Sequence, residues 1–452
     1  MSTEIQLLLA IASGITILLL LIVKLRLNAF LSLLIASIWI GLVAGIPPGQ
    51  IADIIAKGMG DTLAFVATIV GLGTIFGAIL EHTGGARQLS QFLVKKTGDK
   101  RARIAILISG FIVAIPVFFD VAFIILFPVA KALSRRLRKP LLYFALPLLT
   151  GIALTHSFIP PTPGPVAVAD ILTVDLGWMI LLGIPIAFPV ALICGLWISK
   201  KLTFSTVNDE EELEEISGQN ETNSHNLVLL TNMAILLPLV LMIANAILKT
   251  LLEENLIEPF PGSGYLLLIG HPFTALLLAT LFAIYILGKR SGLKKESLFE
   301  ISNKSLAPAG TIILITGAGG VLKQMLIATD IGPLIAEQLG DSSASLILLA
   351  YITAALVRIL QGSATISMVT GAGIVAPLID LFPEMTMLDK SLLALSIAAG
   401  SVIASHVNDS GFWIVNRFLK QEVTETLKSW TILSTAISLS SFLIILILAQ
   451  FI

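Results

Sequence analysis

Long apolar stretches recur along almost the whole chain, and they limit the folds that it can adopt. Stretches of about 18 to 25 residues, the length needed to cross the roughly 30 Å hydrocarbon core of a bilayer, begin at Ile5 and continue to the C-terminus. Of the 452 residues, 56% are hydrophobic and only 13% are charged, and the mean hydropathy is +0.97. These values predict an integral membrane protein with helical spans, because a backbone in lipid must pair its own polar groups.

Motifs typical of several other protein classes are absent from the sequence. We find no nucleotide-binding motif, no cluster with metal-ligand spacing and no basic patch for nucleic acid, so we expect neither a primary pump nor a cofactor. The single Cys194 excludes an intramolecular disulfide. With no basic residue before Ile5 and no cleavage motif after the first apolar stretch, the N-terminus is predicted to be a retained helix.

The positions of Lys and Arg in short loops predict the topology, because these residues mark the cytoplasmic side of a membrane. Lys24 and Arg26 follow the first apolar stretch, so the N-terminus is expected outside the cell. The loops then alternate through five crossings in the first half. These crossings are 5–23, 28–46, 62–80, 140–170 and 176–198, and a loop with Asp53, Lys57 and Asp61 precedes the third.

Residues 110 to 131, GFIVAIPVFFDVAFIILFPVAK, do not fit this alternation. Clusters of Lys and Arg stand on both sides of this segment, so both of its ends require the cytoplasmic face. A re-entrant hairpin over 104–131, with its tip near Pro116 to Asp120, satisfies both ends, whereas one straight span does not.

The second half repeats this plan with the two sides of the membrane exchanged. Two of the crossings, one in each half, are broken at THSFIPPTPGP (155–165) and at SHVNDSG (405–411), and prolines rule out a continuous helix at the first. The second-half crossings are 227–248, 264–287, 306–328, 390–416 and 430–450, with a hairpin at 343–379 that enters from outside.

The predicted fold is therefore an all-α polytopic protein made of an inverted repeat. Each half has five transmembrane helices plus one re-entrant hairpin, and the odd number of spans inverts the second copy. We expect a first repeat over 1–201, an acidic cytoplasmic linker over 202–226 and a second repeat over 227–452, with both termini outside. The alternative is a plain run of twelve spans in which each hairpin is a single crossing.

The helix breaks point to a binding site near the middle of the membrane. Broken helices leave unpaired backbone groups, which persist in a membrane only where they line a wet cavity or a bound solute. Helix N-termini at about Val121, Val166, Ile366 and Phe412 carry partial positive charge and suit an anion. We therefore expect the two hairpin tips and the two breaks to meet around one cavity.

Arg358 is the only basic residue between Lys323 and Lys390, and it lies close to the tip of the second hairpin. It could pair with a substrate carboxylate, or it could cap carbonyl groups or pair with an acidic residue. Short polar side chains near the tips and breaks suit a polyhydroxylated solute, although each could bond its own helix backbone instead. The expected substrate contacts are Thr155, Ser157, Thr162, Ser363, Thr365 and Asn408, and Ser405 belongs to the same group.

Four titratable residues are candidates for proton coupling. Asp120 could carry a proton, bind a cation or cap the second arm of its hairpin, and the same three roles are open to Asp409. His156 and His406 open the two breaks at equivalent positions. Each could relay protons, or it could be a neutral ring that holds loop carbonyls.

Four segments carry a resemblance to a known family. They are GLGTIFGAILEHTGGA (71–86), IPVFFDVAFIILFPVA (115–130), HSFIPPTPGP (156–165) and RILQGSATISMVTGAG (358–373), and they resemble the gluconate permease family of proton symporters, within the ion transporter superfamily. The resemblance implies a homodimer with paired re-entrant hairpins that imports a sugar acid such as gluconate with protons by an elevator-like movement. Sodium-coupled members of that superfamily have Ser-Asn-Thr motifs where this chain has FFD and QGSAT, which favours protons.

We therefore expect a secondary transporter, not an enzyme, in the inner membrane of a bacterium. Its partners would be a small anionic or zwitterionic substrate, protons and the lipid bilayer, with no nucleic acid. A symporter of D-serine or a glycerate-type acid, a sodium-coupled carboxylate transporter and an anion channel stay open as alternatives. A membrane-embedded enzyme with Asp120 and Asp409 as an acid/base pair is a further one.

Overall fold

The structure, a computed structural model, describes residues 3–203, 225–330 and 343–451, and every regular element in these ranges is helical. The helices of the first range are α1 (Thr3–Val23), α2 (Ala29–Ala44), α3 (Pro48–His82), α4 (Gly85–Thr97), η1 (Asp99–Arg101), α5 (Ala102–Val113), α6 (Phe119–Leu137), α7 (Leu142–Phe158), α8 (Pro163–Ile171), α9 (Leu176–Leu192), η2 (Ile193–Ile198) and α10 (Ser199–Lys201). The later helices are α11 (His225–Glu253), α12 (Ser263–Gly270), α13 (Pro272–Phe282), η3 (Ala283–Gly288), α14 (Lys295–Ala328), α16 (Ser343–Gln361), α17 (Ala364–Ile379), α18 (Met387–Val402), α19 (Ser410–Phe418), α20 (Val423–Thr426), η4 (Leu427–Thr431) and α21 (Ile432–Leu448). Most of the expected acidic linker, residues 204–224, lies outside the described residues.

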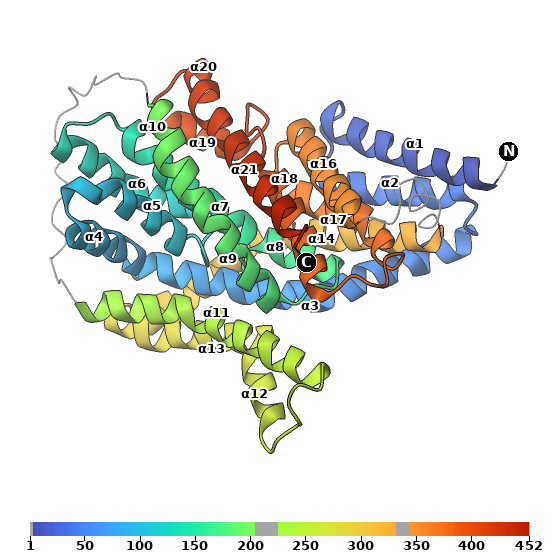
Figure 1. The fold of residues 1–452 in the computed structure, drawn as a ribbon, viewed down its shortest axis with the longest axis horizontal. Coiled ribbons are helices and arrows are strands. Elements are labelled where there is room, and N and C mark those ends of the chain that lie inside the picture. The colour runs from blue at the N-terminus through green and yellow to red at the C-terminus, as the bar shows by residue number, and fades with distance from the viewer. Residues whose placement is uncertain (1–2, 204–224, 331–342, 452) are drawn as a thin grey trace.

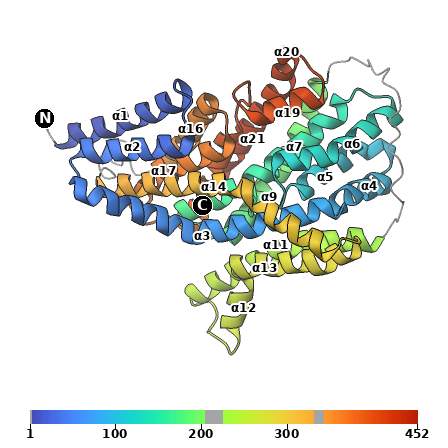
Figure 2. The same ribbon diagram turned by 180° about the vertical axis from the view of Figure 1, so that it is seen from behind.

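Two long helices, α3 and α14, run side by side through the middle of the molecule (Figure 1). Helices α4 to α7 lie at one end of this pair and α1 and α2 at the other, while α11 to α13 project from one side (Figure 2). Within the described ranges, seven helices are long and apolar enough to cross a membrane, and a bent pair of helices would make an eighth. The chain is thus an all-helical, multi-span membrane protein.

Two crossings differ from those expected. Helix α3 starts at Pro48 and α14 at Lys295, so the expected loop with Asp53, Lys57 and Asp61 is the first part of a 35-residue helix. The prediction was wrong here because it stopped each helix at the edge of the apolar stretch. After Pro48, whose fixed backbone angle suits a helix start, residues 49–61 contain no further proline, and the helix accommodates Gly49, Gly58 and Gly60.

The expected crossing over 264–287 is not one straight helix, because α12 and α13 meet at an angle of 64°. The residue before a proline avoids the helical conformation, and His271, which precedes Pro272, is extended with φ −58° and ψ 137°. Its side chain accepts a hydrogen bond from the backbone N–H of Phe273 at 3.3 Å, so it caps the new helix.

The hairpins and broken helices have their breaks at the expected places. Residues 114–118 separate α5 from α6, and residues 362–363 separate α16 from α17. The break in the crossing 140–170 covers residues 159–162, and the break in 390–416 covers residues 403–409. That the hairpins enter the membrane from opposite faces stays a prediction.

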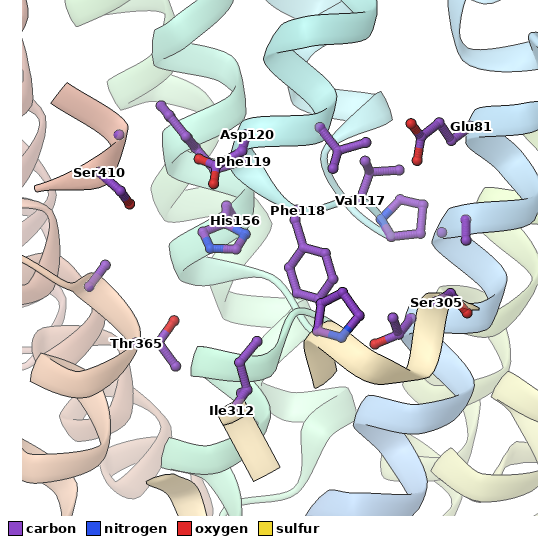
Figure 3. A pocket seen from close by; sticks show the side chains of 18 of the residues that line it. Glu81, Val117, Phe118, Phe119, Asp120, His156, Ser305, Ile312, Thr365 and Ser410 are labelled. Atoms are coloured by element: carbon purple, nitrogen blue, oxygen red, sulfur yellow. The ribbon is translucent and has the colours of Figure 1, made fainter. Parts of the chain in front are cut away.

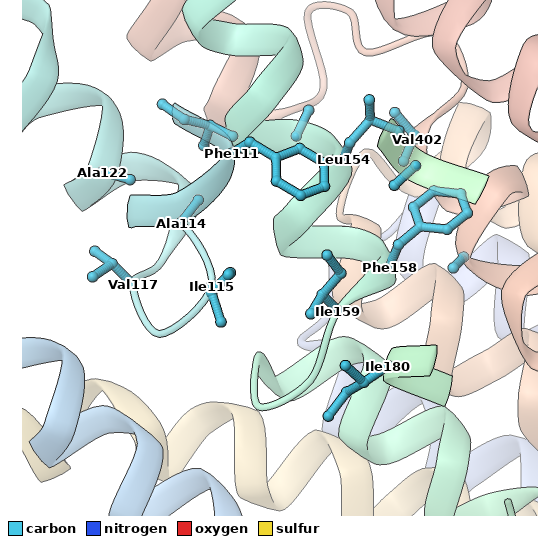
Figure 4. Close-up of a cluster of buried hydrophobic side chains, with 14 of the residues drawn as sticks. Phe111, Ala114, Ile115, Val117, Ala122, Leu154, Phe158, Ile159, Ile180 and Val402 are labelled. Atoms are coloured by element: carbon cyan, nitrogen blue, oxygen red, sulfur yellow. The ribbon is translucent and has the colours of Figure 1, made fainter. Parts of the chain in front are cut away.

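The first hairpin tip lies inside the protein. Ala114, Ile115 and Val117 at the tip are at most 5% exposed, and they belong to one apolar cluster with Phe158 and Ile159 of the α7–α8 break (Figure 4). Burial in protein is what allows non-helical backbone at membrane depth, because lipid offers its polar groups no partner. The apolar residues of the tip therefore fix the two breaks against each other.

Helices α3 and α14 cross with their backbones in contact at Gly58 and Gly320. A Cβ atom built on Gly58 would lie 2.6 Å from the carbonyl oxygen of Gly320, and one built on Gly320 would lie 2.5 Å from that of Gly58. These are distances that a methyl group cannot adopt, so small residues set how closely the two helices approach.

We expect Gly320→Ala to lower the free energy of unfolding by about 1–3 kcal/mol, because the added methyl group overpacks this crossing. The measurement is thermal unfolding of the purified protein in detergent. Gly310→Ala, in the same helix, is the matched control: nothing lies within 4 Å of its Cβ position, and alanine there should stabilise the helix by roughly 0.5–1 kcal/mol. Equal melting temperatures for the two variants would contradict the close crossing.

Candidate functional site

One large cavity, of about 1020 Å³, lies between the α3–α14 pair and the helix breaks. Its wall includes the tips of both hairpins, the end of α7 and the break between α18 and α19. Glu81 and Ser305 lie on one side of it, and Asp120, Thr365 and Ser410 lie on the other (Figure 3). Both hairpin tips and the α18–α19 break therefore meet around a shared space, as predicted, whereas Pro161 and Thr162 of the α7–α8 break line a separate small pocket.

Three helices direct their N-terminal ends at this cavity. The first turns of α6, α17 and α19 contribute Asp120, Thr365 and Ser410 to its wall. The N-terminus of α8, which was expected to join them, instead borders a separate pocket of only about 10 Å³ through Thr162 and Pro163. The unpaired N–H groups and the partial positive charge of three helix ends favour an anion.

Arg358, in the last turn of α16, forms a buried ion pair with Asp409. The two residues are 5% and 8% exposed, and Arg358 Nη2 donates to Asp409 Oδ2. Both side chains line the cavity. Arg358 Nε is buried and has no hydrogen-bond partner, so the guanidinium has free capacity toward a bound anion. Of the roles open to Arg358, pairing with an acid is the one seen here.

Asp409 is held by two further hydrogen bonds. Its Oδ1 accepts from the backbone N–H of Gly411 at 3.0 Å, which makes it the N-cap of α19, and its Oδ2 accepts from Ser405 Oγ. Trp430 Nε1 donates to Ser405 Oγ at 2.7 Å, and Ser405 N–H donates to Ser434 Oγ at 3.0 Å. These contacts connect the ion pair to the start of the last long helix.

Asp120 and His156 face the same cavity from α6 and α7 (Figure 3). Asp120 is partly buried and makes no side-chain hydrogen bond to any residue that the structure describes. The ring centroid of His156 lies 6.5 Å from that of Phe119, and its Nδ1 is buried without a partner. Both side chains thus present unused polar atoms to whatever occupies the cavity.

Among the predicted substrate contacts, three hydroxyl residues lie in the cavity wall. They are Ser157, Ser363 and Thr365. Ser363 Oγ also accepts from the backbone N–H of Ile366 at 3.4 Å, so this residue caps α17. Thr365 lies two residues after that cap and faces the cavity (Figure 3).

The other four predicted site residues bind backbone carbonyl groups and lie outside this cavity wall. Thr155 Oγ1 donates to Phe111 O and Thr162 Oγ1 to Ile159 O, each at 2.8 Å. His406 Nε2 and Asn408 Nδ2 both contact Ile359 O, at 2.9 and 2.8 Å. Carbonyl groups near helix ends lack intrahelical partners, so the four polar side chains join the breaks to their neighbours.

Glu81 and Trp430 are among the cavity residues that were not predicted from the sequence. Glu81 lines the cavity one turn after Gly77, whose Cα lies against the carbonyl of Pro116 in the hairpin tip. The i to i+4 spacing on one helix face was the available signal. Trp430 gave no signal, because it follows the breaks by some 20 residues and reaches Ser405 only in the folded protein.

One end of the cavity is wet and the other is dry. Lys304 and Glu300 form an ion pair at 2.6 Å with side chains 76% and 62% exposed, whereas the Arg358–Asp409 pair is almost fully buried. Within the described residues, no group of three His, Cys, Asp or Glu residues could hold a metal ion. The cavity thus runs from exposed charged side chains at one end to a buried ion pair at the other.

Comparison with known proteins gives one consistent result. A family model described as GntP family permease matches residues 5–452. The low-affinity gluconate transporter of Escherichia coli (strain K12) is 38% identical over 437 residues, which cover 96% of each chain. The gluconate permease of Bacillus subtilis (strain 168) is 34% identical over 453 residues, 98% of this chain and 99% of the relative. The Gnt-II system L-idonate transporter of Escherichia coli (strain K12) is 34% identical, with 96% of this chain and 97% of the relative covered.

The fold is also similar to that of a solved transporter structure. The Alcanivorax borkumensis YdaH transporter matches with a TM-score of 0.65 over 93% of this chain and 98% of its own, at 14% sequence identity. This likeness concerns the fold alone. A further relative, at 35% identity over 98% of both chains, is named as an inner membrane permease of Escherichia coli (strain K12).

Proposed function

Because the chain belongs to the GntP family of permeases, and is therefore a membrane transporter rather than an enzyme, we propose that it imports gluconate or a closely related hydroxy monocarboxylate together with protons. The observation that carries the proposal is the buried guanidinium of Arg358, with its unpaired Nε, beside three helix N-termini in one cavity. A buried cation with unused donors suits a carboxylate. Relatives named for gluconate and L-idonate support the choice of a sugar acid.

The proposed substrate lies with its carboxylate on Arg358 and on the N-termini of α17 and α19. Its hydroxyl groups contact Ser157, Ser363 and Thr365, which line the same cavity. Asp120, Asp409 and His156 are the candidates for proton exchange. A lone anion that enters an inside-negative cell opposes about 2.3 kcal/mol per 100 mV, so its accumulation requires accompanying positive charge.

The proposal includes an inverted repeat over 1–201 and 227–452, in which one part moves past the other like an elevator. The order of elements supports it: α3 and α14, of 35 and 34 residues, are each followed by a helical hairpin and then by a broken helix. Loops rich in Lys and Arg support a bacterial inner membrane with both termini outside. A homodimer is proposed from the family resemblance.

The direct test is uptake of radiolabelled gluconate into proteoliposomes. We expect saturable accumulation under an inward proton gradient, its loss with a protonophore, and no change when potassium replaces sodium. Uptake that needs sodium at constant pH would contradict proton coupling, and flux that does not saturate and never exceeds equilibrium would indicate a channel. Competition by idonate, glycerate, lactate and D-serine orders the substrates, and substrate recovered unchanged from the vesicles excludes an enzyme.

A further inference from the structure

We infer that the substrate carboxylate replaces the Asp409 carboxylate on Arg358, and that Asp409 takes up a proton from the cavity when this exchange occurs. The inference deepens the proposed function and rests on it. Under this inference, Asp409 occupies the carboxylate site on Arg358 before the substrate binds. Binding of the substrate and binding of a proton then occur together.

The geometry of the ion pair is the first support. Arg358 contacts Asp409 through Nη2, and within the described part of the chain this is the guanidinium's only ion pair. Its Nε stays without a partner although it is buried. A planar guanidinium binds a carboxylate best through two parallel N–H groups, so the present pair leaves part of the fork unused. Arg358 lines the cavity, so an incoming carboxylate can approach its guanidinium from the cavity side.

Charge balance is the second support. Arg358 and Asp409 together are neutral, and a bound carboxylate would leave one excess negative charge where their side chains are only 6% and 11% exposed. Lys304 also lines the cavity, but it is 76% exposed and paired with Glu300. An uncompensated buried charge is strongly unfavourable. Protonation of Asp409 restores neutrality, with one proton for each monocarboxylate.

The groups around Asp409 favour this residue as the proton acceptor. Arg358 of α16, Asp120 of α6 and His156 of α7 share the cavity wall with Asp409, and His406 in the same break is turned to Ile359 O. The other titratable residues of that wall are Glu81, His82, Glu300 and Lys304. When the substrate carboxylate pairs with Arg358, Asp409 no longer has a counter-ion, and the Asp120 carboxylate remains its neighbour. Asp120 has no ion pair among the described residues, so the exchange does not deprive Asp120 of a counter-ion.

The protonated form of Asp409 also has hydrogen-bond partners already in place. Its Oδ1 can keep the backbone N–H of Gly411, and an O–H on Oδ2 can donate to Ser405 Oγ, which also accepts from Trp430 Nε1. A hydroxyl oxygen has two lone pairs and can accept both bonds once its own hydrogen turns away. The step therefore converts a carboxylate and a proton from water into a carboxylic acid that keeps both of its hydrogen-bond partners, and its cost is that the Ser405 O–H gives up Asp409 Oδ2 as acceptor.

The test is to count protons as purified full-length protein binds D-gluconate, by calorimetry in buffers of different ionisation enthalpy. We expect the wild type to take up about one proton per gluconate, with a Kd that rises about tenfold per pH unit once Asp409 is ionised in the empty protein. Asp409→Asn should bind gluconate with no proton uptake and a Kd independent of pH. It should exchange gluconate across vesicles but lose proton-driven accumulation. Asparagine can still accept from Gly411, so the α19 cap survives.

Asp175→Asn is the comparison variant: Asp175 also caps a helix, by accepting from the backbone N–H of Gly177 at 2.8 Å, but it lies outside the cavity wall, so this variant should keep the proton uptake that accompanies binding. The inference is overturned if wild-type binding takes up no proton, or if Asp409→Asn keeps the wild-type proton count. Neither result would contradict the proposed transport of gluconate. If the wild type binds no gluconate at any pH, the proposed substrate is wrong and the inference falls with it. The wild-type proton count decides the matter even where the Asp409 variant does not fold.

Discussion

Replacing Arg358 with Gln is expected to reduce kcat/KM for gluconate uptake by roughly 30-fold to a few thousandfold. Truncating one partner of a buried, hydrogen-bonded charge pair costs roughly 2–5 kcal/mol, and each 1.4 kcal/mol is a factor of ten. Arg358 is the buried cation of the cavity, so a bound carboxylate loses its main counter-ion. Initial rates in proteoliposomes, normalised to the amount of inserted protein, measure the effect.

Two further variants separate binding from folding. Arg358→Gln leaves Asp409 as an uncompensated buried charge, which should lower the melting temperature as well as the uptake rate. The double variant Arg358→Gln/Asp409→Asn removes both charges, so it should recover the stability but not the uptake. Arg358→Lys keeps the charge without the planar fork, so its uptake rate should lie between those of the wild type and Arg358→Gln. Uptake within threefold of wild type in Arg358→Gln would show that the carboxylate binds elsewhere.

The second large effect is expected for Gly362→Ala at the tip of the second hairpin. Gly362 has φ +92°, a conformation that strains any residue with a Cβ atom, and a Cβ atom there would overlap Asn408 O and lie 2.5 Å from Asn408 C. The strain costs about 1–2 kcal/mol and the overlap about 1–3 kcal/mol more. Gly362 N–H donates to Arg358 O at 2.8 Å, so a shifted tip also displaces the anion site. We expect at least a tenfold loss of uptake.

Gly292→Ala is the matched control for this substitution. Gly292 also has a positive φ, of +79°, but no atom lies within 4 Å of its Cβ position. It therefore reports the conformational strain alone, with a loss of about 1–2 kcal/mol in the free energy of unfolding and little change in uptake. Equal effects of the two substitutions on uptake would show that contact between the tip and the break is unimportant for transport.

The sequence allowed the breaks to be predicted because each has a local cause. Basic residues on both sides of 104–131 exclude a straight span, and the prolines of 155–165 exclude a continuous helix. The lengths of α3 and α14 were not predicted, because a helix can extend beyond the apolar segment that a membrane requires. The bend at His271 depends on a single proline inside an otherwise apolar stretch, and such a proline can also lie within a continuous helix, as Pro238 does in α11.

The sequence allowed the charged and titratable residues of the site to be predicted, but not the partners with which they form ion pairs and hydrogen bonds. Arg358, Asp409, Asp120 and His156 were singled out because charge in an apolar segment is costly, and all four line one cavity. The bond between Arg358 and Asp409 joins residues 51 positions apart, and no local pattern contains that information. Hydroxyl groups are harder still to assign. Thr155 has the same chemistry as Thr365, and only the fold directs it to a backbone carbonyl.

The size of the cavity has a consequence for hydration. A space of about 1020 Å³ has room for on the order of 30 water molecules at their volume in the liquid. A sugar acid fills only part of it, so most of this water must leave when the protein encloses its cargo. The equilibrium between open and enclosed forms then depends on water activity. Solutes too large to enter draw water out, so a hyperosmotic medium should strengthen retention of the cargo.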